Sequence, residues 1–267
     1  MATVRVSGVE VGYARVGDGQ GPPLVLVHGA GLDGRMWQPQ AQALAADFTV
    51  VAWDEPGAGR SSDVPAGFAL ADYARALAAV VEDLGLGAAH VAGLSWGGTV
   101  VLELYRLRPD LVKTLILIDT YAGWKGSLPP EEVAVRVMGA ERMLAAPRER
   151  FDPTLPGLFA GDGPPEEFVG LLDAMQREVR PETLGAQLAI MAEADLTDVL
   201  PRITVPTLLL WGEADIRSPL GVARDFAAAI PDAELVVLPG VGHMSNLEDP
   251  AGVTGALRAF CRAHASA

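Results

Sequence analysis

The chain has 267 residues, half of them apolar, and its formal net charge at pH 7 is -14. This length and apolar content suffice to bury one large core without disulfides or metals, so we expect one domain with an insertion. The negative charge argues against binding to nucleic acid or to anionic membrane surfaces, because the chain would repel such polyanions.

The cysteine content and the N-terminus indicate where the protein works. Cys261 is the only cysteine, so no internal disulfide can form, which fits a reducing compartment. Its helical spacing with Leu257 and Phe260 predicts a buried structural thiol. The N-terminus lacks a basic start followed by an apolar run, and no apolar segment is long enough to span a membrane. The sequence therefore predicts a soluble, cytoplasmic protein without membrane contacts.

In the first 120 residues, predicted strands alternate with predicted helices. An antiparallel hairpin, 3–6 with 9–16, comes first. Several later strands are uninterrupted apolar runs, which are typical of strands buried on both faces of a parallel sheet. The predicted strands are 24–27, 48–53, 88–94 and 115–118, and the predicted helices are 36–46, 70–84 and 96–107. This alternation predicts a mostly parallel sheet with right-handed crossovers.

The alternation stops after residue 120 and resumes near residue 201. Between them, apolar spacing predicts three helices, 131–144, 166–179 and 181–192, two of which start at or just after Pro165 and Pro181. We expect residues 121–200 to form a helical cap inserted into a core of residues 1–120 and 201–267. Glycines and prolines between 153 and 165 predict a loop that can move. Beyond the insertion, strands are predicted at 205–211 and 234–238, and helices up to 230 and over 247–264.

The segment Gly93-Leu94-Ser95-Trp96-Gly97 lies between a predicted strand and a predicted helix. A strand that turns into a helix around Gly-x-Ser-x-Gly is the nucleophile elbow of serine hydrolases. Small residues on either side permit the sharp turn, which exposes the serine oxygen above the sheet edge. The next helix directs its first N–H groups to the same place, which suits a developing oxyanion. The five residues alone are weak evidence, because about one chain in ten of this composition would match by chance.

Partners for Ser95 follow later strands. A serine hydroxyl needs a base to take its proton, and the base needs a third group that holds its tautomer. Ser95, Asp215 and His243 each follow a predicted strand, and the carboxyl ends of parallel strands meet at one sheet edge. We therefore expect the three side chains to lie together, in the chain order nucleophile, acid, base.

With these residues in place, the chain resembles the α/β-hydrolase family over essentially its whole length. The matching segments are Val27-His28-Gly29-Ala30-Gly31, Asp54 with Gly57-Ala58-Gly59-Arg60-Ser61, Gly93-Leu94-Ser95-Trp96-Gly97-Gly98, Gly212-Glu213-Ala214-Asp215 and Gly240-Val241-Gly242-His243. The resemblance implies an α/β fold with a mostly parallel, eight-stranded, doubly wound sheet and an inserted helical cap. It makes Ser95 the nucleophile, His243 the general base and Asp215 its orienting acid. The backbone N–H groups of Ala30 and Trp96 would form the oxyanion hole.

Other polar residues offer alternatives to these assignments. Asp119 also ends a predicted strand, and some family members take the acid from that position, so it competes with Asp215. His28 is expected to shape the turn that forms the oxyanion hole. Asp54 and Arg60 are expected to brace their loop rather than to catalyse.

Candidate pocket residues and cofactors can also be predicted. Apolar side chains expected to bind substrate are Trp37, Trp124, Met138 and Met244, with Trp96 and Phe159 as further candidates. No histidine or cysteine pair has metal-ligand spacing, so no metal site is predicted. The glycines after the strand 24–27 do not complete a dinucleotide-binding unit. We therefore predict that no cofactor is needed.

The predicted function is hydrolysis of carboxylic esters or lactones of small, largely apolar molecules through an acyl-enzyme. The loop 28–37 and the short cap resemble those of small-substrate esterases and enol-lactone hydrolases. Cleavage of carbon–carbon bonds, hydroxynitrile lysis and perhydrolysis use the same three residues on the same fold, so they stay open. A small-molecule receptor that keeps these residues is a further alternative. The natural substrate and the oligomeric state are left open.

Overall fold

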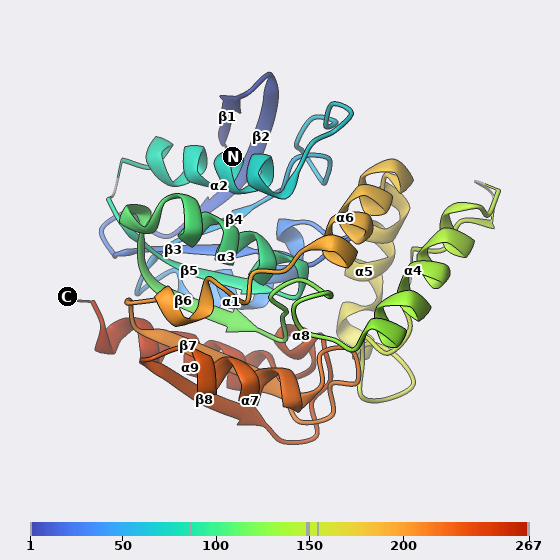
Figure 1. Cartoon of the computed structure of the whole chain (residues 1–267). Coiled ribbons are helices and arrows are strands. Elements are labelled where there is room, and N and C mark those ends of the chain that lie inside the picture. Colours follow the sequence, from blue (N-terminus) through green and yellow to red (C-terminus); the bar gives the residue numbers. More distant parts are fainter. Residues whose placement is uncertain (1, 86, 148–149, 154, 266–267) are drawn as a thin grey trace.

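The computed structural model describes residues 2–85, 87–147, 150–153 and 155–265. A single sheet with the strand order β1-β2-β4-β3-β5-β6-β7-β8 crosses the molecule (Figure 1). Its strands are β1 (Ala2–Val6), β2 (Val9–Val16), β3 (Pro23–Val27), β4 (Thr49–Trp53), β5 (Ala89–Leu94), β6 (Val112–Ile118), β7 (Thr207–Gly212) and β8 (Ala233–Leu238). The prediction of an eight-stranded sheet is confirmed.

The pairing of the strands sets one functional edge. β1 and β2 form the predicted antiparallel hairpin, and β2 pairs antiparallel with β4. All other neighbours, from β4 through β3, β5, β6 and β7 to β8, are parallel. The carboxyl ends of these strands therefore meet at one edge of the sheet, where ligands bind in folds of this kind.

The sheet separates two apolar layers because successive side chains point to opposite faces. The covering helices are α1 (Gln38–Leu44), α2 (Leu70–Asp83), α3 (Trp96–Leu107), α7 (Leu220–Ala229) and α9 (Pro250–Ala263), and short 3₁₀ turns are η1 (Gly34–Trp37), η2 (Pro109–Leu111) and η4 (Leu200–Arg202). Val25 and Val27 pack with α2, α3 and α7, whereas Leu24 and Leu26 pack with α1 and α9 on the other face. The central strands β3, β4, β5 and β7 are thus buried on both faces, as their apolar runs predict.

The segment between β6 and β7 is helical. It contains α4 (Pro130–Leu144), α5 (Glu166–Glu178) and α6 (Pro181–Glu193), which lie beyond one end of the sheet, at the right in Figure 1. The starts and ends of these helices agree with the predicted helices to within one residue. α4 has no buried residue, whereas α6 buries six side chains, among them Leu184 and Gln187. The boundaries 121 and 200 of the cap stay a prediction.

Two predicted helices are each divided in the structure. The predicted helix 247–264 was wrong as one element, because α8 (Ser245–Glu248) ends before α9 begins at Pro250. Proline cannot donate the hydrogen bond that would continue α8. The Asp249 side chain instead accepts from the N–H of Gly252 at 2.9 Å and caps α9. Similarly, the predicted helix 36–46 begins as the 3₁₀ turn η1 and continues as α1.

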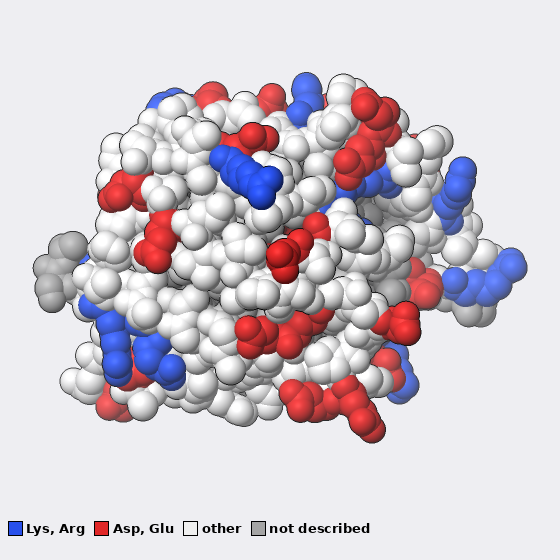
Figure 2. Space-filling model, turned by 90° about the horizontal axis from the view of Figure 1, so that it is seen from below, with Lys and Arg blue, Asp and Glu red and all other residues white. Residues whose placement is uncertain are grey.

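Surface charge and the buried thiol agree with the composition. Figure 2 shows acidic side chains spread over one face, whereas basic side chains form fewer groups, one of them at the right-hand end where α4 lies in Figure 1. Cys261 is buried, and burial raises the pKa of its thiol to about 12. None of the helices in the described part of the chain is long and apolar enough to cross a membrane.

Candidate active site

The turn between β5 and α3 holds Ser95 in a strained backbone conformation. Its φ of 55° and ψ of -120° are rare for a residue with a side chain. The N–H of Ser95 donates to the carbonyl of Ile118 at 3.0 Å, and the Thr120 hydroxyl donates to the carbonyl of Ser95. Strain of this kind persists where the surrounding structure enforces it, commonly at functional sites.

Glycines permit this turn because neighbouring backbone occupies the space of a side chain. A Cβ on Gly97 would lie 2.6 Å from the carbonyl oxygen of His28 and still closer to that of Val27. We expect Gly97→Ala to lower the free energy of unfolding by at least about 3 kcal/mol. In Gly255→Ala, on α9, the new methyl group meets no atom within 4 Å, so a rise of about 0.5–1 kcal/mol is expected. Urea unfolding of both variants tests this, and a Gly97→Ala protein as stable as the wild type would contradict it.

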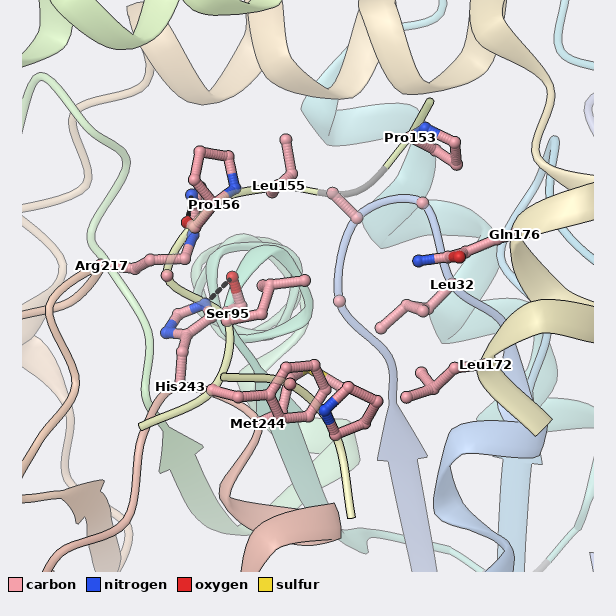
Figure 3. A pocket seen from close by; sticks show the side chains of 18 of the residues that line it. Leu32, Ser95, Pro153, Leu155, Pro156, Leu172, Gln176, Arg217, His243 and Met244 are labelled. Atoms are coloured by element: carbon pink, nitrogen blue, oxygen red, sulfur yellow. Dashed lines mark hydrogen bonds between the residues drawn. The ribbon is translucent and has the colours of Figure 1, made fainter. Parts of the chain in front are cut away.

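Ser95, His243 and Asp215 form a continuous line of hydrogen bonds at the carboxyl edge of the sheet. His243 Nε2 lies 2.8 Å from Ser95 Oγ, and His243 Nδ1 lies 2.7 Å from Asp215 Oδ2 (Figure 3). The three residues come from the loops after β5, β7 and β8. The structure therefore brings together the three side chains that the sequence selects.

The carboxylate of Asp215 fixes the tautomer of His243. Its Oδ1 accepts from the backbone N–H groups of Arg217 at 2.7 Å and Ser218 at 2.9 Å, which directs Oδ2 to the imidazole. Since a carboxylate can only accept, the proton of the neutral ring lies on Nδ1. Nε2 then has a lone pair that can accept the proton of Ser95.

The pH dependence of hydrolysis should follow His243. Burial lowers the pKa of His243 from its ordinary value, and the nearby Asp215 carboxylate partly offsets this effect. Only the neutral imidazole can accept a proton, so activity is lost as the pH falls through the pKa of His243. We expect kcat/KM for a p-nitrophenyl ester to rise from acid pH to a plateau, with a midpoint below about 6.5, the reference value for histidine. A midpoint above 7 would contradict this expectation.

Asp119, the alternative acid, lies close to Asp215 but makes different contacts. Its Oδ1 accepts from the N–H of Gly212 at 2.7 Å. Burial, and then the negative charge of Asp215, raise the pKa of Asp119 well above its ordinary value. In this structure His243 bonds to Asp215, not to Asp119.

Ala30 and Trp96, the residues expected to supply the oxyanion hole, both lie close to Ser95. Ala30 lies in the wall of the cavity at Ser95, and Trp96 is the first residue of α3. Within the described residues, neither N–H donates to a protein acceptor. His28 fixes the preceding turn, since its Nε2 accepts from the N–H of Glu55 at 3.0 Å and its Nδ1 lies 2.9 Å from the carbonyl oxygen of Gly29.

A buried polar network that the sequence did not reveal joins these two segments. The indole N–H of Trp96 donates to the carboxyl of Glu55 at 2.5 Å, and the side-chain amide of Gln187 donates to its other oxygen. The amide oxygen of Gln187 accepts from the N–H of Gly31 at 3.2 Å. Burial raises the pKa of Glu55 well above its ordinary value. Glu55 and Gln187 are 132 residues apart, so no local pattern could pair them.

The cavity above Ser95 has a volume of about 430 Å³ and mostly apolar walls. Its sides come from the loop 29–32, from Pro153 and residues 155–164, from α5 and from the loop after β7. The lining residues labelled in Figure 3 are Leu32, Ser95, Pro153, Leu155, Pro156, Leu172, Gln176, Arg217, His243 and Met244. The loop rich in glycine and proline thus forms part of the cavity wall.

The apolar residues expected to bind substrate lie in three different places. Met244 lines the cavity at Ser95, as does Phe159. Trp37 is fully buried in the core layer under β3 and β4, and it is absent from the cavity wall as described. Trp124 and Met138 line a neighbouring cavity of about 520 Å³ beside α4. Helical spacing shows that such side chains turn inward, but it does not distinguish core from cavity.

Over the described ranges, no group of three or more His, Cys, Asp or Glu side chains could hold a metal ion. Several polar side chains line the cavity at Ser95. Among them are a hydroxyl, an imidazole and a guanidinium.

An elbow serine hydrogen-bonded to a histidine at the edge of a mostly parallel sheet is the arrangement found in α/β hydrolases. A family model described as the alpha/beta hydrolase family matches residues 24–256. The chain belongs to this family.

Individual relatives are similar over nearly the whole chain. A RutD protein of Pseudomonas syringae pv. syringae, named for carbamate hydrolysis, is 32% identical over 90% of this chain and 93% of its own length. A thermophilic esterase from Thermogutta terrifontis, solved with malate bound, is 31% identical, covers 99% of this chain and 97% of its own, and has a TM-score of 0.82. The enol-lactonase from Burkholderia xenovorans LB400 is 27% identical, with coverages of 98% and 100% and a TM-score of 0.81. These relatives support a hydrolase of ester or lactone type.

Proposed function

We propose that the chain is a serine hydrolase that cleaves carboxylic esters or lactones of small, largely apolar molecules through an acyl-enzyme. The observation that carries this proposal is the hydrogen-bonded line from Asp215 through His243 to Ser95. The line ends at a cavity of about 430 Å³, a size typical of sites for small molecules.

In the proposed reaction, Ser95 Oγ attacks the substrate carbonyl while His243 Nε2 takes its proton. The imidazolium then protonates the leaving alkoxide, and the acyl group stays on Ser95 as an ester. Water attacks this ester by the same route, which releases the acid and restores the hydroxyl. Asp215 stabilises the imidazolium formed in both halves of the reaction. No cofactor takes part in these steps.

The N–H groups of Ala30 and Trp96 are proposed to bind the oxyanion of both tetrahedral intermediates. Ala30 lines the cavity at Ser95 and Trp96 follows Ser95 in the chain. Neither N–H donates a hydrogen bond to a protein acceptor among the described residues. Loss of one such donor lowers the rate by on the order of a hundredfold or more in serine hydrolases. The network through Glu55 and Gln187 would hold the loop of Ala30 against α3.

The helical insertion is proposed to act as a cap that selects the substrate. α5 contributes Leu172 and Gln176 to the cavity wall, and the preceding loop contributes Leu155 and Leu158. These side chains close an apolar space over Ser95, which favours substrates with short hydrocarbon parts. The esterase and the enol-lactonase among the relatives are consistent with this substrate class.

The proposed function is tested by initial rates on p-nitrophenyl esters of two to twelve carbons and on small lactones, in buffer treated with a chelator. We expect repeated turnover with a maximum among the shorter chains, because the cavity is small. At most one turnover per chain would favour a receptor. Turnover confined to carbon–carbon or cyanohydrin substrates would also overturn the proposal.

A further inference from the structure

Arg217 is a cation in the wall of the cavity at Ser95. It follows the proposed catalytic Asp215 by two residues, and its half-buried side chain lies on the His243 side of the cavity, beside Pro156 (Figure 3). It also lines the neighbouring cavity beside α4, whose wall includes Arg136 and one carboxylate, Asp152. Arg217 therefore lies where the two cavities meet.

Among the described residues, no carboxylate forms an ion pair with the guanidinium of Arg217. One of its N–H groups donates to the carbonyl of Pro156 at 2.9 Å, and no ion pair forms with any described residue. The two oxygens of Asp215 are taken by His243 and by backbone N–H groups, and Glu132 pairs with Arg136. Buried charges in proteins are usually paired, so a half-buried cation that forms no ion pair with a described residue is a candidate for binding an anion.

Other acidic groups in the same wall do not neutralise this cation. Asp162 and Asp173 also line the cavity at Ser95, but both are exposed to solvent, where water screens their charges. Burial lowers the pKa of Arg217 from its ordinary value, yet an arginine side chain stays charged at neutral pH.

The backbone of Arg217 is fixed from both sides. Its N–H donates to Asp215 at 2.7 Å, and its carbonyl accepts from the guanidinium of Arg136 at 2.5 Å. Arg136 is itself held by the Tyr121 hydroxyl at 3.0 Å and lies over the rings of Tyr121 and Trp124. The side chain of Arg217 thus extends from a rigid point, which reduces the entropy lost when it binds a ligand.

We propose that Arg217 binds a carboxylate of the substrate, so that preferred substrates are esters or lactones with a carboxylate on an otherwise apolar skeleton. This inference rests on the proposed function. The flat guanidinium offers paired N–H donors that match a carboxylate, and the leucine side chains elsewhere in the cavity wall suit the hydrocarbon part. Leu32 and Gln176 lie on the opposite side of Ser95 from Arg217 (Figure 3), so the carboxylate would be on the part of the substrate that extends past His243.

The inference is tested with substrate pairs that differ in charge but not greatly in length. Monomethyl glutarate against methyl hexanoate places the carboxylate on the acyl side, and 4-acetoxybutanoate against pentyl acetate places it on the alcohol side. Initial rates by pH-stat give the ratio of kcat/KM, anionic to neutral, for each pair. We expect Arg217→Gln to lower this ratio about 10-fold to 100-fold in one pair, the size of effect of a lost hydrogen bond to a charged group.

The controls separate charge recognition from damage to the site. Arg224→Gln removes an exposed guanidinium from α7 and should leave the ratio unchanged. Arg217→Lys keeps the charge and should give an intermediate ratio. If Arg217→Gln hydrolyses neutral esters but leaves both ratios as in the wild type, the inference is wrong and the proposed function stands. If the wild type hydrolyses neither anionic nor neutral esters, both are wrong.

Discussion

Replacing Ser95 by alanine is expected to lower kcat/KM for p-nitrophenyl butyrate by at least about a thousandfold. The substitution removes the hydroxyl that bonds to His243 and leaves the rest of the cavity in place. The remaining rate would come from water activated by His243 and from the binding of substrate in the cavity. Stopped assays at high protein concentration can measure such a residual rate.

A matched serine shows whether the loss is specific. Ser62→Ala removes an exposed hydroxyl near β2, far along the chain from the site, and should keep kcat/KM within about twofold of the wild type. Both variants should melt within a few degrees of the wild type. If Ser95→Ala keeps more than a tenth of the activity, the nucleophile is another group.

Replacing Asp215 by asparagine is expected to lower kcat by on the order of ten thousandfold. The amide cannot stabilise an imidazolium, and its N–H₂ group can force the wrong tautomer on His243. The ring proton would then lie on Nε2, where it blocks proton transfer from Ser95.

Asp119→Asn is the matched control, because Asp119 is also buried and also follows a strand. Asparagine can keep the acceptor for the N–H of Gly212, and Asp119 makes no hydrogen bond to His243. We therefore expect less than about a tenfold change in kcat. A larger loss in Asp119→Asn than in Asp215→Asn would assign the acid to the end of β6.

The fold could largely be predicted from the sequence because its strands are unusually uniform. Runs such as that of β3 contain only apolar residues, which is the pattern of a strand buried on both faces of a sheet. Glycine and proline mark most helix ends, and the helices of the insertion agree with prediction. The predicted helix 247–264 is divided at Pro250, although its apolar residues keep helical spacing. α8 ends before this proline, and α9 begins at it.

The selection of Ser95, Asp215 and His243 needed only the strand ends, because parallel topology places all such ends at one edge. The cavity wall could not be predicted in this way. Trp37 and Met244 were both expected to bind substrate, yet Trp37 lies in the core and Met244 lines the cavity at Ser95. The difference depends on how the insertion packs on the sheet, which no local pattern determines.

Arg217 was missed for a different reason, although a signal existed. It lies two residues after Asp215 in a loop that was already expected to carry chemistry. An arginine in such a loop could have been noted as a candidate for substrate binding. Its lack of a carboxylate partner, however, depends on the positions of Asp215, Glu132 and Arg136 in space.

Covalent trapping tests the central claim most directly. A p-nitrophenyl alkylphosphonate ester resembles the tetrahedral intermediate and transfers its phosphonyl group to an activated serine oxygen, with release of p-nitrophenolate. Intact mass and peptide mapping would then locate the label. The account predicts one phosphonyl group per chain, on the peptide that contains Ser95, with loss of ester hydrolysis in proportion to labelling. Ester hydrolysis that persists after complete labelling of Ser95, or inactivation by a label on another residue, would contradict it.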